Sequence, residues 1–191
     1  AVCAFAVIST ANLYIPRVQP GSISEIKRYA LIPDFSMLPQ SRSDINEIIS
    51  LKRKLDKAVP QNKTLGILAS SFKFNEDVFK NAEPSVGIKS SRSDYIVSLP
   101  QVDSRDTDMT PFYNVNYILA AFPAQTHLPE GRQTTVTEAV KSFEAYADFA
   151  VAYEEMPEYE TAIDGVTFKL YRRTEMVHDD AMREFEKRLN K

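Results

Sequence analysis

The chain has 191 residues, of which 43% are hydrophobic and 26% are charged, and its formal net charge is -3. Acidic and basic residues are interspersed, so no basic stripe predicts nucleic-acid binding and no polybasic cluster predicts attachment to an anionic membrane surface. The single cysteine excludes an internal disulfide framework and a cysteine-ligated zinc site.

The first 42 residues are the least regular part of the sequence. They open with the apolar run AVCAFAVI, which has eight residues, whereas a membrane-spanning helix needs about 20. Four prolines then interrupt residues 9–42. For residues 1–42 we expect an irregular N-terminal arm or a membrane-exit segment, and for residues 43–191 a single α/β domain.

A helix is predicted directly after this segment. An apolar stripe at helical spacing runs through SRSDINEIISLKRKLDKAV, whose opposite face is charged, and Pro60 stops it. Glu47 fits a capping box counted from Asp44. Another short helix is predicted in FNEDVFKNAEP, with Asn75 as its cap and Pro84 at its end.

Three short apolar runs bounded by polar turns predict buried strands, at residues 65–69, 95–99 and 116–121. The stretch QVDSRDTDMTPF between the second and third strands predicts a polar loop. After the third strand, the pattern predicts a helix over residues 134–148.

The C-terminal part predicts a hairpin and an amphipathic terminal helix, the helix in VHDDAMREFEKRLNK. Two alternating runs flank Asp164-Gly165, a dipeptide suited to a tight turn with positive φ. This order of elements predicts an α/β fold, arranged as a three-layer sandwich with a mostly parallel central sheet and an antiparallel C-terminal hairpin at the edge.

The turn after the third strand carries the first candidate contact residues, Gln125, Thr126 and His127. Open α/β sheets bind ligands at the C-terminal ends of their strands. His127 can act as a general base or a metal ligand, but we favour a hydrogen-bonded turn histidine, because position in a fold is weak warrant for function. We therefore expect contact with a ligand or partner, and no catalytic residue.

The acidic loop VDSRDTD carries the second candidate set, Asp103, Arg105, Asp106 and Asp108. Clustered carboxylates can hold a cation, but the spacing misses the EF-hand pattern. DTD also matches the Asp-x-Asp site of nucleotide-sugar transferases, a motif short enough to arise by chance. We favour a solvated loop that contacts a ligand or partner, with no metal and no cofactor.

Serine and aromatic residues leave two further alternatives. Ser70 and Ser71 follow the first strand without a Gly-x-Ser-x-Gly elbow, so turn serines are favoured over a nucleophile. Six aromatic residues are expected in or near the core, although an exposed subset could stack on sugar rings: Tyr113, Tyr117, Phe122, Phe143, Tyr146 and Phe149.

Three stretches together resemble a known family. They are LGILASSFKFNEDVFKNAEPS, NVNYILAAFPAQTHLPEGRQTTV and DGVTFKLYRRT, within residues 43–174. They resemble the C-terminal extracytoplasmic soluble domain of bacterial multi-spanning membrane glycosyltransferases, which depend on lipid-phosphate sugars and are related to protein mannosyltransferases. In that family the catalytic acid lies on an early loop between membrane helices, so no catalytic residue carries over to this chain. VDSRDTDMTPF matches no motif of the family.

The resemblance implies a non-catalytic accessory domain on the extracytoplasmic face of the bacterial cell membrane, positioning an acceptor or glycan. Its implied partners are the membrane portion of the same polypeptide and a glycan or lipid-linked sugar, with no nucleic acid. The residues alone leave a second hypothesis open. This is a free-standing soluble α/β ligand-binding protein or enzyme, with a polar pocket at the strand ends near Ser70, Leu99 and His127.

Overall fold

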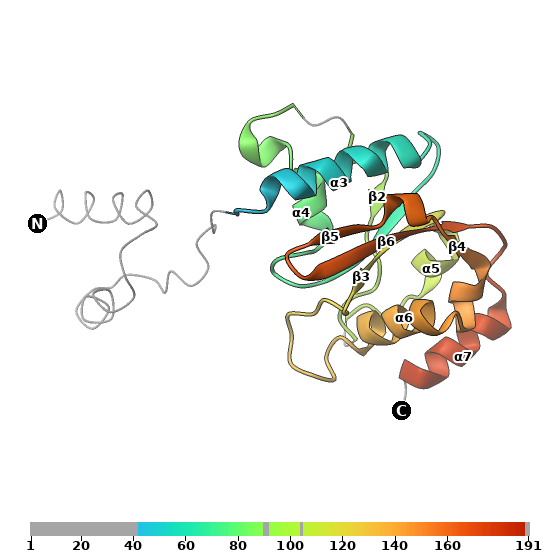
Figure 1. The fold of residues 1–191 in the computed structure, drawn as a ribbon. Helices are drawn as coiled ribbons and strands as arrows, with labels where there is room; N and C mark the ends of the chain where they lie inside the picture. The colour runs from blue at the N-terminus through green and yellow to red at the C-terminus, as the bar shows by residue number, and fades with distance from the viewer. Residues whose placement is uncertain (1–41, 90–91, 104, 190–191) are drawn as a thin grey trace, which may run out of the picture. The chain divides into compact units, whose positions relative to one another are not determined.

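The structure, a computed structural model, describes residues 42–89, 92–103 and 105–189 (Figure 1). The expectations for an N-terminal arm or membrane-exit segment fall outside these residues. From Asp44 onward the chain forms one compact unit. No helix within the described ranges is long and apolar enough to cross a membrane.

One mixed sheet is formed by six strands of the described chain. Its members are β1 (Leu65–Leu68), β2 (Ile96–Val97), β3 (Tyr117–Phe122), β4 (Tyr153–Glu155), β5 (Thr161–Ile163) and β6 (Val166–Arg173). β1 lies between β2 and β3 and is parallel to both. β6 pairs antiparallel with β3, and its other edge pairs antiparallel with β4 and β5. The predicted mixed sheet with a parallel centre is therefore confirmed.

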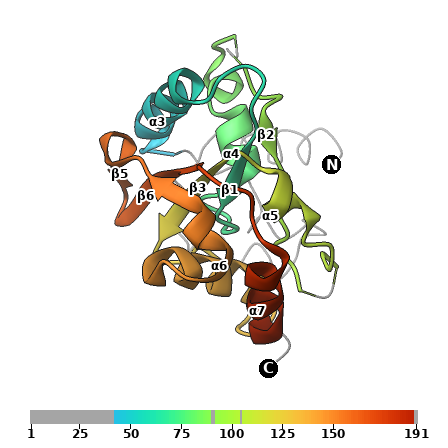
Figure 2. The same cartoon turned by 90° about the vertical axis from the view of Figure 1, so that its right-hand side faces the viewer.

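Helices cover both faces of this sheet, which gives three layers (Figures 1 and 2). The helical segments are α3 (Ile45–Ala58), α4 (Glu76–Asn81), η2 (Pro84–Val86), α5 (Thr110–Asn114), α6 (Thr134–Ala145), η3 (Asp148–Ala152), η4 (Pro157–Tyr159) and α7 (Asp179–Leu189). Because successive strand residues point to opposite faces, Ile67 and Leu119 pack toward α3 and α4. Their neighbours Leu68 and Ile118 pack toward α5, α6 and α7.

Several local features follow the sequence. Asn75 caps α4 by accepting a hydrogen bond from the Val78 N–H, at 3.0 Å. The predicted hairpin turn has positive φ at both central residues, 47° at Asp164 and 77° at Gly165, as a type I′ turn requires. β3 ends at Phe122, directly before Pro123, which cannot donate to the ladder.

Other features differ from the prediction. Asp44 precedes α3, but its side chain makes no capping hydrogen bond, so the predicted capping box is wrong. α6 ends at Ala145 because Tyr146 adopts a left-handed conformation, with φ 48°. The expected polar loop contains α5, which buries Phe112 completely. β4 had no distinct sequence signal because it is only three residues long.

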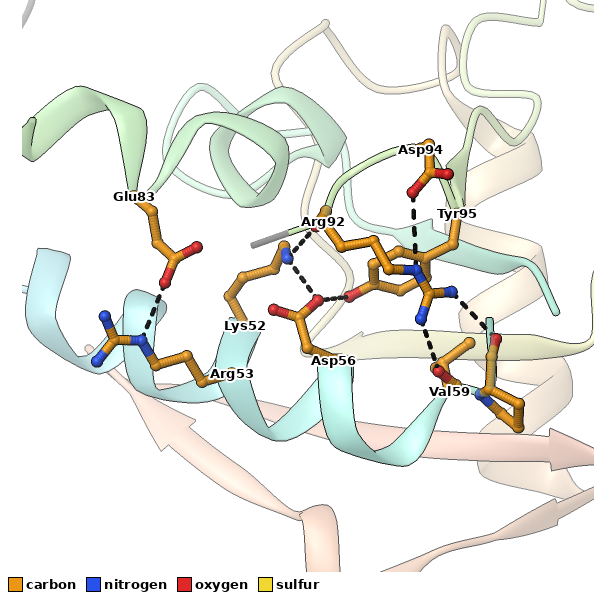
Figure 3. Close-up of polar contacts among 9 residues, drawn as sticks. Lys52, Arg53, Asp56, Val59, Glu83, Arg92, Asp94 and Tyr95 are labelled. Carbon is orange, nitrogen blue, oxygen red and sulfur yellow. Dashed lines mark hydrogen bonds and ion pairs between the residues drawn. The ribbon is translucent and has the colours of Figure 1, made fainter. Parts of the chain in front are cut away.

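A polar network fixes the segment before β2 against α3 (Figure 3). Lys52, which is 1% exposed, forms an ion pair with Asp56 at 2.6 Å and also donates to the Arg92 carbonyl. The Tyr95 hydroxyl donates to Asp56 at 2.8 Å, and the Arg92 guanidinium lies 4.3 Å from the centre of the Tyr95 ring. Burial, and then the hydrogen bond to Asp56, raise the pKa of Tyr95. The buried lysine is thus fully paired, at the N-terminal ends of the parallel strands.

Candidate functional site

A polar cavity of about 680 Å³ lies at the C-terminal ends of the parallel strands. Its walls come from the residues that follow β1, the first turn of α4, the residues that follow β2, the loop before α5, and the segment after β3. Ser70, Leu99 and His127 all line it. The second functional hypothesis expects a deep polar pocket at these three strand ends, and the function that it names stays a prediction.

Gln133 links the strand ends next to this cavity through hydrogen bonds of its side-chain amide. The residue is 3% exposed, and its side-chain oxygen accepts from the backbone N–H groups of His127 and Leu128, at 2.8 and 2.9 Å. These two donors fix the orientation of the amide, so its nitrogen faces the Ser70 hydroxyl and donates to it at 2.7 Å. The Ser70 hydroxyl in turn donates to the side-chain oxygen of Gln101, at 2.7 Å.

His127 is held by the backbone of the neighbouring strand end. The Ser70 N–H donates to the Gln125 carbonyl at 2.8 Å, and Ser70 forms a parallel bridge with Thr126. The Nδ1 atom of His127 is hydrogen-bonded to the Ser70 carbonyl oxygen. A carbonyl oxygen only accepts, so Nδ1 carries the proton and Nε2 is the acceptor of the neutral ring.

This arrangement disfavours Ser70 as a nucleophile. The hydroxyl lies 3.5 Å from His127 Nδ1, but a protonated Nδ1 cannot take up its proton. The hydroxyl hydrogen is instead directed at Gln101. A serine nucleophile needs a base aligned to accept that proton, and the geometry supplies a hydrogen-bonded turn in its place.

The three aspartates of the loop are turned to different backbone partners. Asp103 accepts from the backbone N–H groups of Thr134 and Thr135, at 2.7 and 2.9 Å, at the start of α6. Desolvation opposes ionisation of Asp103, but these hydrogen bonds outweigh it and lower its pKa. Asp108 accepts from the Thr110 N–H at 2.9 Å, and hydrogen bonds from Thr110 lower its pKa also.

Asp106 braces the loop after β2. Its carboxylate accepts from the backbone N–H groups of Gln101 and Val102, both at 3.1 Å. Arg105 adds two hydrogen bonds, at 2.6 and 2.8 Å. The hydrogen bond from Arg105 is the main cause of a pKa far below the ordinary value for Asp106, so the group stays ionised at neutral pH.

Only some of the predicted contact residues line the same cavity. Arg105, Asp106, Asp108 and His127 line the cavity, whereas Asp103, Gln125 and Thr126 are not among its lining residues. Within the described ranges, no group of three or more His, Cys, Asp or Glu side chains is placed to hold a metal ion.

Four residues of the site escaped the sequence reasoning: Phe72, Glu76, Gln101 and Gln133. Glu76 accepts from the Ser98 hydroxyl at 2.6 Å through one oxygen, while its other oxygen is buried without a partner among the described residues. Phe72 is 77% exposed and lines the cavity. None of the four belongs to a motif, because their roles arise from contacts between strand ends.

The cavity wall is acidic. Its described lining residues include four acidic side chains, those of Glu76, Asp77, Asp106 and Asp108, and one basic side chain, that of Arg105, which pairs with Asp106. A wall of one sign repels ligands of the same sign. The cavity is therefore poorly suited to a phosphate-bearing ligand.

Comparison with known proteins found no matching family model, no matching curated protein and no matching solved structure. Fold and site together define an α/β protein with a polar cavity at the C-terminal ends of its parallel strands.

Proposed function

We propose that this chain is a binding domain that holds a small polar ligand at the C-terminal ends of β1 and β2. The cavity of about 680 Å³ carries this proposal. Its volume lies within the range of small-molecule sites, about 300–1,000 Å³, and it occupies the edge at which open α/β sheets bind ligands.

The chemistry of the cavity favours binding over catalysis. Ser70 and the Nδ1 atom of His127 are engaged in hydrogen bonds that fix the turn, and among the described residues no third group aligns the Nε2 atom of His127 with a nucleophile. Asp106 is committed to Arg105 and to two backbone donors. A general acid or base must exchange protons near neutral pH, and a carboxylate held ionised by such partners is a poor candidate.

The resemblance of residues 43–174 supports a particular setting for this binding role. We propose an accessory domain on the extracytoplasmic face of the bacterial cell membrane, which positions an acceptor or glycan. The membrane portion of the same polypeptide would then carry out the transfer. The acidic wall agrees with this division of labour, because it disfavours the phosphate of a lipid-linked donor.

Ligand binding is tested by two-dimensional NMR of the 191-residue chain. Neutral oligosaccharides and other small polar compounds are added in mixtures. We expect shifts for the backbone amides of Gln101, Val102 and His127, which line the cavity. Thr107 lines the cavity and is exposed, so its replacement by Trp should narrow the cavity without disturbing the core and should weaken these shifts. Shifts confined to other surfaces, or unchanged binding by Thr107→Trp, would contradict the proposal.

A further inference from the structure

Phe72 is an exposed aromatic residue at the cavity. Its side chain is 77% exposed, and its ring centre lies 5.0 Å from that of His127, with the two planes at 54°. Both residues line the cavity. Burial of a phenylalanine ring is strongly favourable, so a ligand that enters the cavity and covers the ring of Phe72 gains binding free energy from that contact.

The loop that carries Phe72 is closed beneath it. The Ser71 N–H donates to the Phe74 carbonyl at 2.9 Å, and the Phe74 N–H donates to the Ser71 hydroxyl at 3.0 Å. Phe74 is completely buried, edge-to-face against Phe168 at 5.0 Å. One aromatic residue of the loop is thus anchored in the core, and this anchor holds Phe72 outward. A preorganised contact surface loses little entropy when a ligand binds.

Polar side chains that line the same cavity offer hydrogen bonds. The side-chain nitrogen of Gln101 is a donor, since its oxygen is occupied by Ser70, and the Nε2 atom of His127 is an acceptor. A pyranose ring matches this combination, because it presents a face of C–H groups and an edge of hydroxyl groups. The acidic wall favours a neutral sugar over a phosphorylated one.

We infer that the cavity binds a neutral sugar ring and that Phe72 stacks on its C–H face, while Gln101 and His127 contact its hydroxyl groups. The inference rests on the proposed ligand-binding function and names the chemistry of the ligand. A quaternary ammonium ligand is the main competitor, because aromatic rings and carboxylates also bind cations. Such a cation would not use the hydrogen-bonding groups of Gln101 and His127. Quaternary ammonium ligands are recognised by aromatic cages, whereas among the described residues of the wall only Phe72 and His127 are aromatic.

The test measures binding of maltotriose, mannotriose and triacetylchitotriose to the 191-residue chain by saturation-transfer NMR and titration calorimetry. Glucose 6-phosphate and choline serve as comparison probes. We expect at least one neutral trisaccharide to bind more tightly than either. Replacing Phe72 by Ala should weaken that binding by roughly three- to tenfold, the range of aromatic contacts. Tyr146→Ala is the matched control, because Tyr146 is 65% exposed and lies outside the cavity lining; it should leave the affinity unchanged.

Three outcomes would overturn the inference. Unchanged sugar affinity in Phe72→Ala would remove the stacking role. If choline or another non-sugar compound shifts the cavity amides and sugars do not, the sugar specificity is rejected. The proposed ligand-binding function is then retained. No shift with any compound would reject both. The exposed position of Phe72 makes a folding defect in Phe72→Ala easy to exclude by thermal denaturation.

Discussion

Asp103 shows how a single side chain of the acidic loop serves the fold. It accepts two backbone hydrogen bonds at the start of α6 and a third from the Thr135 hydroxyl, at 3.0 Å. The residue type and its neighbours in sequence suggest a cation site, but backbone N–H groups 31 and 32 positions away occupy its oxygens. Such long-range partners cannot be read from the loop itself, so three aspartates that are close together in sequence bind different backbone groups in the structure.

We predict that Asp103→Asn destabilises the protein by about 1 kcal/mol at neutral pH, because it removes the negative charge that accepts the N–H groups at the start of α6. The folded-state pKa of Asp103 lies below its ordinary value of 3.8. Its contribution is therefore complete above pH 3.8 and is lost as the pH falls through the lower folded-state pKa. Urea denaturation of wild type and Asp103→Asn between pH 7 and pH 3 measures the difference in their free energies of unfolding.

The matched control is Asp94→Asn, because the Asp94 side chain is 86% exposed and its ion pair is with Arg92, at 3.6 Å. It should change the free energy of unfolding by less than about 0.5 kcal/mol. A difference between wild type and Asp103→Asn that is constant down to pH 3 would show that ionisation of Asp103 does not matter.

At the scale of elements, the predicted bounds of β1 and β3 agree with the structure within one residue at each end. A short apolar run between polar turns is typical of a buried strand. The same method misjudges α3. A lysine is expected at the solvated surface of such a helix, yet Lys52 lies on the buried face of α3, among Ile48, Ile49 and Leu55, and pairs with Asp56 beside the segment before β2 (Figure 3). The charge pattern of a helix shows which of its residues can lie in solvent. Contacts with other parts of the chain determine which of them are exposed.

We predict that Lys52→Met destabilises the protein by about 3–5 kcal/mol, because it leaves the Asp56 carboxylate without its buried cation. Lys57→Met is the control, since Lys57 lies on the same helix and is exposed. The double change Lys52→Met with Asp56→Leu should recover part of the loss by removing the carboxylate that has lost this cation. Chemical denaturation measures all three, and a double variant less stable than the sum of both single changes would argue against this account.

At the scale of the whole molecule, the predicted layer order and the edge that carries the site both follow from the order of helices and strands. The cavity itself does not. Gln133 comes from the segment before α6, Gln101 from the segment after β2, and Ser70 from the end of β1. Their hydrogen bonds form only when the parallel strands are aligned, so no local sequence pattern predicts them.

The same alignment leads to a last prediction, that this chain by itself transfers no sugar. Three of the candidate groups at the strand ends are held by hydrogen bonds and are not aligned with one another: His127 through Nδ1, Ser70 through Gln101, and Asp106 through Arg105. An acid and a base aligned on one reacting atom are what such chemistry requires. Incubation of the purified chain with a lipid-linked sugar and candidate acceptors should give no product by mass spectrometry, even where sugar binding is measurable. Product formation that is lost in Ser70→Ala or His127→Ala would instead place an active site at these strand ends, and the free-standing enzyme would become the better account of the cavity.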